Sequence, residues 1–384
     1  LNPGFYESGK QWSEPYPPAF CDFASVETDS GNAAFYMVPA SETFQPATIE
    51  TGAHESGKHG YYTHKMPVSL VPGGSWQSPR ICIVAGKSVY DAMRSYMKDS
   101  GILQYAPLNK KLSASLFQKL VQSPILKLDQ SANVDIPTVS NFIDQMPTDA
   151  IAHLAAFWPG GFDKNYPDYL PPDAEYGTLE DFKNLTTKIR KRGMLVMPYT
   201  NPTWWNEGPT LKKLGAQSIT VKNLDGSMLQ EKYNGNPGFV VQPEHPMVVA
   251  RNAETVREFT ETAPMDLLFQ DQVGARRWIY TMDSAVSAGY SQGLINEAER
   301  SSKKIPLMTE AGFDRLIPYE TGFCGMASLS FPKFKEYDDL WGKGNWTVEP
   351  VSVFAAHGRV IFYQHNLSDD VLSDSDQKIT WNMV

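Results

Sequence analysis

Two acidic residues, Asp271 and Glu310, stand where chemistry is expected, because each follows a short apolar run and is followed closely by a glycine. Residues 267–269 precede Asp271, and residues 305–308 precede Glu310. Such a run is typical of a buried parallel strand, which carries the residue at its carboxyl end to the mouth of a barrel. Most glycosidases cleave the glycosidic bond with a pair of carboxyl groups, and the ends of two successive strands can supply such a pair. The pattern therefore predicts a catalytic pair of carboxyl groups.

Polar or aromatic residues also end the other candidate strands. In a barrel, such positions converge on one face. A sugar site needs carboxylates for the chemistry, amides for hydroxyl groups and flat aromatic rings against the apolar face of the sugar. We also expect Arg276, together with Arg277, to lower the pKa of Asp271, since a nearby cation stabilises a carboxylate. The predicted substrate-binding residues are Trp158, Asp163, Asn201, Trp204, Trp205, Gln242, Arg276 and His365.

Each of these residues also has a purely structural interpretation. A strand-end acid can cap the next helix, and Trp204 and Trp205 could be a core pair, although alternation along an extended segment would expose one of them. Arg276 could pair with a structural acid, and His365 could be a core histidine. Asp314 is a second candidate acid/base or simply a charge at a helix start. Six polar strand ends in order favour the functional interpretation for the set.

From about residue 150 onward, strand-like and helix-like segments alternate. Thr178, for example, is expected to cap a helix, with Asp181 three residues later. This α/β alternation predicts a parallel sheet, and seven strands suit a (β/α)8 barrel of the TIM type better than an open sheet. We expect the eighth strand beyond the last residue, so that the barrel is incomplete at its C-terminus. The seven strands are expected at 153–158, 193–199, 238–243, 266–271, 305–310, 325–330 and 359–365.

Two further units are predicted before the barrel. Residues 1–87 contain short apolar and aromatic runs separated by Gly, Pro and Ser, which is typical of antiparallel strands and predicts a partial, sandwich-like β-rich domain. Residues 88–148 are expected to form a helical connection and a linker, with the polar, proline-bearing linker near 122–148. The catalytic barrel then occupies residues 149–384.

The composition restricts the possible partners. The 384 residues are 41% hydrophobic and 12% aromatic, which is ample for a core, and the net charge of −9 argues against a nucleic-acid partner. No apolar run approaches the roughly 20 residues of a membrane helix. The three cysteines are too far apart for a disulfide scaffold or a short-spaced zinc motif. Sequons at Asn184, Asn345 and Asn366 favour secretion, while compartment and oligomeric state stay open.

Four segments resemble a known group of barrel proteins. They are FWPGGFDKNYPDYLPPD at 157–173, YTNPTWW at 199–205, FQDQVGAR at 269–276 and TEAG at 309–312. They resemble an uncharacterised glycoside-hydrolase-like (β/α)8 family that is related to the endo-α-N-acetylgalactosaminidases and, more distantly, to the retaining α-galactosidase clan. The resemblance covers residues 150–384. It implies Asp271 as nucleophile, Glu310 as acid/base and Asp163 as a residue that holds sugar hydroxyls.

The predicted function is therefore that of a retaining α-glycosidase acting on galactose-type, N-acetylgalactosamine-type or related glycosides without a cofactor. Its partner would be an oligosaccharide or glycoconjugate substrate, with no nucleic acid and no membrane. Retention requires the two carboxyl groups to lie about 5–5.5 Å apart, whereas roughly 6.5–9.5 Å gives inversion. Two alternatives remain: a non-catalytic carbohydrate-binding barrel, and a metal-dependent hydrolase on the same fold, which would need clustered histidines at the strand ends.

Overall fold

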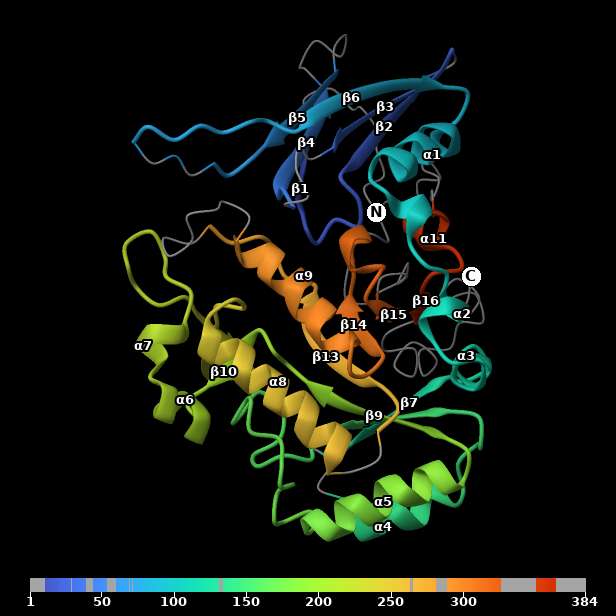
Figure 1. Cartoon of the computed structure of the whole chain (residues 1–384), viewed down its shortest axis with the longest axis vertical. Helices are drawn as coiled ribbons and strands as arrows, with labels where there is room; N and C mark the ends of the chain where they lie inside the picture. The colour runs from blue at the N-terminus through green and yellow to red at the C-terminus, as the bar shows by residue number, and fades with distance from the viewer. Residues whose placement is uncertain are drawn as a thin grey trace.

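The fold contains one large parallel sheet and three small antiparallel sheets (Figure 1). The computed structural model describes residues 11–28, 30–38, 44–53, 60–68, 70, 72–130, 134–262, 265–280, 289–325 and 350–363. Within these ranges, no helix is long and apolar enough to cross a membrane. The cysteines Cys21, Cys82 and Cys324 are all free thiols.

Two of the antiparallel sheets lie in the N-terminal part of the chain, as expected for this β-rich region. One has the strand order β1-β4-β5 and the other the order β2-β3-β6. Burial alternates along most of β3, since successive side chains of a strand point to opposite faces. The strands are β1 (Gln11–Tyr16), β2 (Phe23–Thr28), β3 (Gly31–Val38), β4 (Ala47–Ala53), β5 (Gly60–Lys65) and β6 (Arg80–Gly86).

Helix α1 (Val89–Asp99) connects the N-terminal sheets to the rest of the chain. It begins at Ser88, whose side chain accepts a hydrogen bond from the backbone N–H of Asp91, and its buried face packs on β3. Three short helices follow, η1 (Ile102–Gln104), α2 (Leu108–Lys111) and α3 (Ala114–Leu120).

The barrel sheet begins earlier than predicted. Strand β7 (Ile125–Asp129) and helix α4 (Ile136–Ile143) lie in residues that we expected to form a linker. β7 pairs in parallel with β8 (Ile151–Ala155), with Ile125 opposite Ile151. Charged residues at positions 127 and 129 interrupt the apolar run of β7. β7 is an end strand of the described sheet and its residues are exposed or partly exposed, so it tolerates charged side chains. The expectation of a linker at 122–148 was wrong in this respect.

Seven parallel strands form this sheet, in the order β16-β15-β14-β13-β9-β8-β7. This is the strand arrangement of a (β/α)8 barrel. Within the described residues, the two end strands β16 and β7 do not pair with each other. The remaining strands are β9 (Leu195–Thr200), β13 (Leu268–Gly274), β14 (Leu307–Ala311), β15 (Glu320–Cys324) and β16 (Ile361–Tyr363).

Helices cover the outside of the barrel sheet. Figure 1 shows α8 and α9 lying together beside β13 in the middle of the view, with α4 and α5 together at its lower edge. α5 begins at Thr178 in the predicted way, because Thr178 and Asp181 form a reciprocal capping box. Every residue of β8 and of β9 is buried, as expected for strands covered on both faces. The helices are α5 (Leu179–Lys191), α8 (Pro246–Glu261), α9 (Gly289–Ser302) and α11 (Val351–Ala356).

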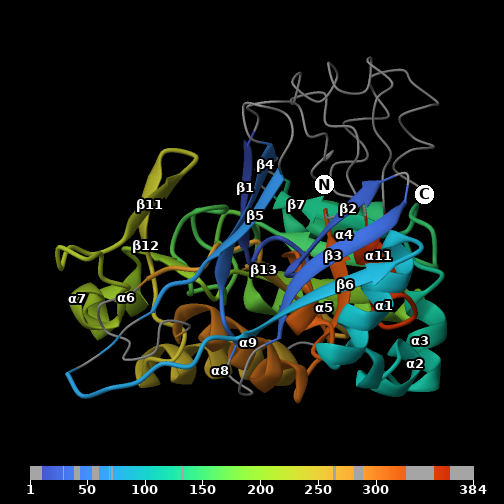
Figure 2. The ribbon, with the colours of Figure 1, turned by 90° about the horizontal axis from the view of Figure 1, so that it is seen from above.

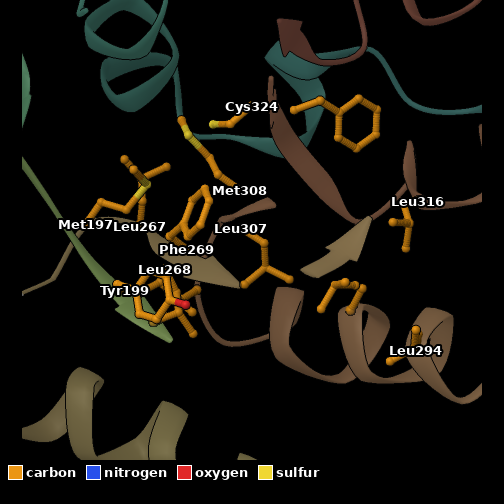
Figure 3. Packing of buried hydrophobic residues seen from close by; sticks show 14 of the residues in the cluster. Met197, Tyr199, Leu267, Leu268, Phe269, Leu294, Leu307, Met308, Leu316 and Cys324 are labelled. Carbon is orange, nitrogen blue, oxygen red and sulfur yellow. The ribbon is translucent and has the colours of Figure 1, made fainter. Parts of the chain in front are cut away.

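Apolar side chains from neighbouring barrel strands pack against one another in the interior. Figure 3 shows Met197 and Tyr199 of β9 beside Phe269 of β13 and Met308 of β14. The rings of Tyr199 and Phe269 are stacked, with centroids 5.9 Å apart. This packing fixes the relative height of β9, β13 and β14, and therefore of the polar residues at their carboxyl ends.

Two of the predicted barrel strands were placed incorrectly. Residues 238–243 were expected to form the third one. However, β12 (Asn236–Val240) is antiparallel and belongs to a separate small sheet with β10 (Trp204–Asn206) and β11 (Gln230–Tyr233). The short helices α6 (Pro209–Leu214) and α7 (Ala216–Ile219) lie between β10 and β11. The sixth strand is β15, which ends just before the predicted range of 325–330, and residues 326–330 lie outside the described residues.

The N-terminal region is attached to the barrel at Asp314, in the short helix η3 (Asp314–Leu316) that follows β14. The hydroxyl groups of Tyr16 and Tyr96 each donate a hydrogen bond of 2.5 Å to the fully buried carboxyl of Asp314. The backbone N–H of Asp314 donates to the carbonyl of Phe20 at 2.8 Å. Asp314 therefore serves in the attachment of the two regions, and its buried carboxyl is not available as the alternative acid/base.

Candidate active site

The two predicted catalytic acids end adjacent strands. β13 and β14 pair in parallel with Gln270 opposite Thr309, so that Asp271 and Glu310 both come next along the chain. The side chains before them are buried, whereas Asp271 and Glu310 are each partly exposed. Both residues are therefore partly exposed at the same end of the sheet.

A bulge in β13 shapes this strand end. Gln270 lies opposite Thr309 but Gly274 lies opposite Ala311, so the residues 271–273 face the single residue Glu310. The backbones approach so closely that a Cβ on Gly274 would lie 2.6 Å from the carbonyl oxygen of Glu310, which explains the glycine. Gln272 has a φ of +65°, a left-handed conformation that is uncommon outside glycine and clusters at functional sites.

Two side chains from β9 and the residue after it contact the carboxyl of Asp271. The hydroxyl of Tyr199 donates to Oδ2 at 2.7 Å, and Nδ2 of Asn201 donates to the same oxygen at 3.4 Å. The orientation of the Asn201 amide is determined by its other end, because Oδ1 accepts from the backbone N–H groups of Thr203 and Trp204. Asn201, one of the predicted sugar-binding residues, thus lies beside Asp271.

The pKa of Asp271 is raised far above its ordinary value. Burial and the negative charge of Glu310 raise this pKa to about 8, and the hydrogen bond from Tyr199 and the charge of Arg276 offset only part of the rise. Arg276 lowers the pKa of Asp271 as we expected, but burial and Glu310 outweigh it, so the expectation that the arginines keep this pKa low overall was wrong. Burial and the charge of Glu310 thus both favour the protonated form of Asp271.

Asp163 belongs to the same cluster. It lies in the loop after β8, with a left-handed φ of +59°, and it is partly exposed. Its negative charge also contributes to the raised pKa of Asp271, which places the two carboxyls within electrostatic reach. Oδ2 of Asp163 accepts a hydrogen bond of 2.6 Å from Nδ2 of Asn234, in the turn between β11 and β12. Burial raises the pKa of Asp163 as well.

Arg276 is buried and fully engaged by protein atoms, so it is not free to bind a substrate. Nη1 donates to both carboxylate oxygens of Glu231, at 2.7 and 2.6 Å. Nη2 donates to Oε1 of Gln272 at 2.7 Å, and Nε donates to the hydroxyl of Thr203 at 3.0 Å. The structure supports the alternative that Arg276 pairs with a structural acid.

The three predicted aromatic platforms have no exposed face. Trp158, Trp204 and Trp205 are each 0% exposed. The ring of Trp158 stacks on Tyr199 with centroids 5.2 Å apart, and the ring of Trp204 meets the ring of Tyr233 edge-on at 4.9 Å. The expectation that these tryptophans stack on a sugar was wrong, because other side chains of the protein bury all three rings.

Of the two remaining predicted residues, one does not follow a barrel strand and the other lies outside the described residues. Gln242 follows β12 of the small sheet, and its backbone N–H donates to the carbonyl of Ile219. The reason for placing it at the barrel mouth therefore no longer holds. His365 lies outside the described residues. Across the described part of the chain, no cluster of three or more His, Cys, Asp or Glu residues could hold a metal ion.

The structure also identifies residues that the sequence did not. Tyr199 could have been found, because it lies two residues before Asn201 and side chains two apart on a strand share a face. The sequence gives no such indication for Glu231 and Asn234, because both lie outside the barrel strands. It gives none for Gln272 either, because the direction of that side chain depends on a left-handed backbone conformation.

Several known structures with the same fold are glycosidases. The α-N-acetylgalactosaminidase NagBb from Bifidobacterium bifidum matches 89% of this chain and 57% of its own length, with a TM-score of 0.71 and 13% identity. The GH36 α-galactosidase AgaA from Geobacillus stearothermophilus matches 97% of this chain and 57% of its own length, with a TM-score of 0.57 and 12% identity. The α-galactosidase TtGalA from Thermus thermophilus matches 79% and 55%, with a TM-score of 0.54 and 11% identity.

These similarities establish a shared fold, and the chain spans a little over half the length of the proteins it resembles. No curated protein matches it in sequence. Residues 91–305 match the family described as "Domain of unknown function (DUF6259)", and this match covers more than half of the 384 residues. The chain therefore belongs to the DUF6259 family of proteins.

Proposed function

We propose that this protein is a retaining α-glycosidase in which Asp271 is the nucleophile and Glu310 the acid/base. The observation that carries the proposal is the pair of partly exposed carboxyl groups at the ends of the adjacent strands β13 and β14. Their electrostatic interaction, which raises the pKa of Asp271, supports it, since glycosidases act with two nearby carboxyls of which one is protonated. The fold shared with known glycosidases is consistent with it.

In the first step, ionised Asp271 attacks the anomeric carbon while Glu310 donates its proton to the departing glycosidic oxygen. Within the described residues, both hydrogen bonds to Asp271 go to Oδ2, which leaves Oδ1 as the attacking oxygen. In the second step, Glu310 removes a proton from a water molecule, which attacks the same carbon and releases Asp271. The two displacements return the sugar with its original configuration.

The raised pKa of Asp271 is compatible with its role as nucleophile. Burial is the largest cause of this rise, and the negative charge of Glu310 is the second. In the proposed first step Glu310 is protonated, so the second contribution is absent and Asp271 ionises more readily than it does beside a charged Glu310.

The proposed substrates are α-galactosides or N-acetyl-α-galactosaminides in an oligosaccharide or glycoconjugate. This choice rests on the names of the similar structures, an α-N-acetylgalactosaminidase and two α-galactosidases. Asp163, a partly exposed acceptor within reach of Asp271, is proposed to bind sugar hydroxyl groups. The mechanism uses only side chains of the protein and requires no cofactor.

The proposal can be tested with a panel of aryl α- and β-glycosides, using the wild type, Asp271→Asn and Glu310→Gln. We expect hydrolysis of an α-galactoside-type substrate and a loss of about 10⁴-fold or more in kcat in either variant. Asp225→Asn and Glu299→Gln, which change exposed acids of a turn and of α9, are matched controls and should retain activity. Activity that survives in both site variants contradicts the assignment.

Added azide separates the two roles. Azide should rescue Asp271→Ala by replacing the nucleophile, and the glycosyl azide should have inverted configuration. It should rescue Glu310→Ala by attacking the glycosyl-enzyme, and that product should retain the configuration. Exchanged stereochemistry would exchange the roles of Asp271 and Glu310. Sugar binding without any turnover would favour the carbohydrate-binding alternative.

A further inference from the structure

The hairpin of β11 and β12 is attached to the barrel mouth at two separate points. We refer to residues 230–240 as the hairpin. At the first point, Glu231 of β11 forms the two-oxygen ion pair with Arg276, which follows β13. At the second, Asn234 in the turn donates to Asp163, which follows β8. Figure 2 shows β11 and β12 standing at the edge of the molecule, away from the N-terminal sheets. The hairpin thus connects the segment that follows β8 with the segment that follows β13.

The base of the hairpin is rigidly packed. Trp204 pairs with Val240 across β10 and β12, and its ring lies so close to Gly238 that a Cβ there would be 2.4 Å away. The ring of Tyr233 packs edge-on against the same indole, and its hydroxyl donates to Glu231 at 3.0 Å. A change at Glu231 is therefore transmitted along a stiff element to the turn that carries Asn234.

The Arg276–Glu231 pair is built to hold this element in place. Arg276 is 7% exposed, and removing its carboxylate partner would leave a buried cation without its partner. The guanidinium also contacts Gln272 and Thr203, so that one side chain joins the hairpin to the strand end that carries Asp271. Gln272 in turn accepts from the amide of Asn201, the neighbour of Asp271, at 3.1 Å.

The chemistry at the tip of the hairpin suits a sugar. Asn234 is exposed, and Asp163 is partly exposed. The amide of Asn234 can donate to a substituent oxygen of a sugar, and the carboxylate of Asp163 can accept from an adjacent hydroxyl. In the free protein the two groups bond to each other, which satisfies both until a substrate arrives.

Building on the proposed glycosidase function, we propose that Asn234 and Asp163 form a subsite for two neighbouring substituents of the sugar ring. Arg276 and Glu231 are positioning residues that hold the hairpin so that Asn234 reaches this subsite. The hairpin thereby determines sugar specificity, although it contributes no strand to the barrel sheet.

The first test is hydrogen–deuterium exchange of the hairpin amides in the wild type, Arg276→Met and Arg277→Met. The exposed neighbour Arg277 provides a matched control. In the wild type, opening of the hairpin must break the ion pair between Arg276 and Glu231, and this raises the free energy of opening. Arg276→Met removes that cost, so we expect the amides of residues 230–240 to exchange about tenfold faster or more. They should not change in Arg277→Met. Unchanged exchange in Arg276→Met overturns the positioning role.

The second test measures KM and kcat on the aryl glycoside that the wild type cleaves best. Asn234→Ala should raise KM about tenfold and change kcat by less than about threefold, since it removes binding contacts remote from the reacting bond. Asn234→Asp should raise KM further, because it places a second carboxylate against Asp163. Arg276→Met should raise KM together with its faster exchange, whereas Asn234→Ala should leave exchange outside the turn unchanged. A wild-type KM in Asn234→Ala overturns the subsite.

Failure of this inference can be told apart from failure of the proposed function. The probe is 1-deoxygalactonojirimycin, the ligand named with one of the similar α-galactosidases, and binding is measured by calorimetry. If the wild type binds the probe, loses about tenfold in affinity on Asn234→Ala and hydrolyses no glycoside, the subsite stands and the catalytic proposal falls. If hydrolysis occurs and Asn234→Ala changes neither KM nor probe affinity, the catalytic proposal stands and the subsite falls. If the wild type neither hydrolyses a glycoside nor binds the probe, both fall.

Discussion

The hydroxyl of Tyr199 on β9 lies 2.7 Å from Oδ2 of Asp271 on β13 and donates a hydrogen bond to it. The bond can form because Phe269 is paired with Tyr199 in the sheet, which brings the carboxyl end of β13 to the level of β9. Burial raises the pKa of Tyr199 well above its usual value, so the phenol stays neutral. Tyr199 therefore remains a hydrogen-bond donor to the proposed nucleophile.

We predict that Tyr199→Phe will lower kcat by about 10–100-fold, the effect of losing a hydrogen bond to a charged group. The ring stacking on Trp158 is kept in this variant. Because the lost bond stabilises ionised Asp271, the pKa of Asp271 will rise, and the acidic limb of the pH–rate profile will move to higher pH. Tyr105→Phe, in a helical connection outside the site, serves as the control. An acidic limb that does not move would show that the bond does not stabilise ionised Asp271.

Asp271→Asn should stabilise the protein at alkaline pH. The pKa of Asp271 is about 8 in the folded protein, against an ordinary value near 3.9. Between these values the folded state holds a proton that the unfolded state has lost, so stability from this group is present at low pH and is lost as the pH rises through 8. Asparagine cannot ionise and avoids the loss.

We therefore expect Asp271→Asn to raise Tm by about 2–4 °C at pH 9, the shift that roughly 1 kcal/mol gives. The difference should shrink as the pH falls towards 4, because a growing fraction of the wild-type carboxyl is then protonated in the unfolded state as well. Thermal unfolding between pH 4 and 9 measures this directly. A constant difference across the range would exclude titration of Asp271 as its cause.

Glu320, at the start of β15, should show a similar pH dependence although it is not part of the site. It is fully buried, and neither carboxylate oxygen has a hydrogen-bond partner among the residues that the structure describes. Burial raises its pKa to about 8, and burial lowers the pKa of Lys111 to about 7. Above pH 8, therefore, Glu320 is charged while Lys111 is neutral.

Glu320→Gln is accordingly predicted to raise Tm by about 2–4 °C at pH 9 and to leave it nearly unchanged at pH 5. Stability from Glu320 is present below its unfolded pKa and is lost as the pH rises through 8. Glu175→Gln, at an exposed position, should have no such dependence. Equal effects at both pH values would contradict the prediction.

Gly238→Ala should destabilise the small sheet. The added Cβ would lie 2.4 Å from two ring carbons of Trp204, and this tryptophan is itself fully buried. Such overpacking costs about 1–3 kcal/mol, which corresponds to a Tm lower by about 2–12 °C. Combining the change with Trp204→Phe should recover part of the loss, because the smaller ring makes room. Additive losses in the double variant would mean that the contact is not the cause.

The barrel strands that could be predicted from the sequence are buried strands with an apolar run. β8, β9, β13 and β14 are such strands, whereas β15 is equally buried but begins with Glu-Thr-Gly and was missed. β7 was missed, since charged residues break its apolar pattern. β12 was assigned to the wrong sheet, because its apolar run packs on Trp204 and not between barrel helices. An apolar run indicates burial but does not specify the layer that buries it.

The same physical limit applies to the candidate site. Asp271 and Glu310 could be placed beside each other, because the ends of neighbouring parallel strands necessarily meet. The tryptophans could not be assigned to the core or to the surface, because that depends on which loops cover them. Asn234 and Glu231 had no sequence signal, since their position depends on a hairpin folding back over the barrel and no periodic pattern encodes that direction.

The attachment at Asp314 has a consequence for engineering this protein. Asp314 follows the proposed acid/base by only four residues, and it is held by Tyr16 and Tyr96 from two distant segments of the chain. The loop after β14 is therefore completed by residues that precede the barrel. The N-terminal region cannot be exchanged like a detachable module, because a barrel grafted without it would keep both carboxyl groups and lose the support beneath one of them.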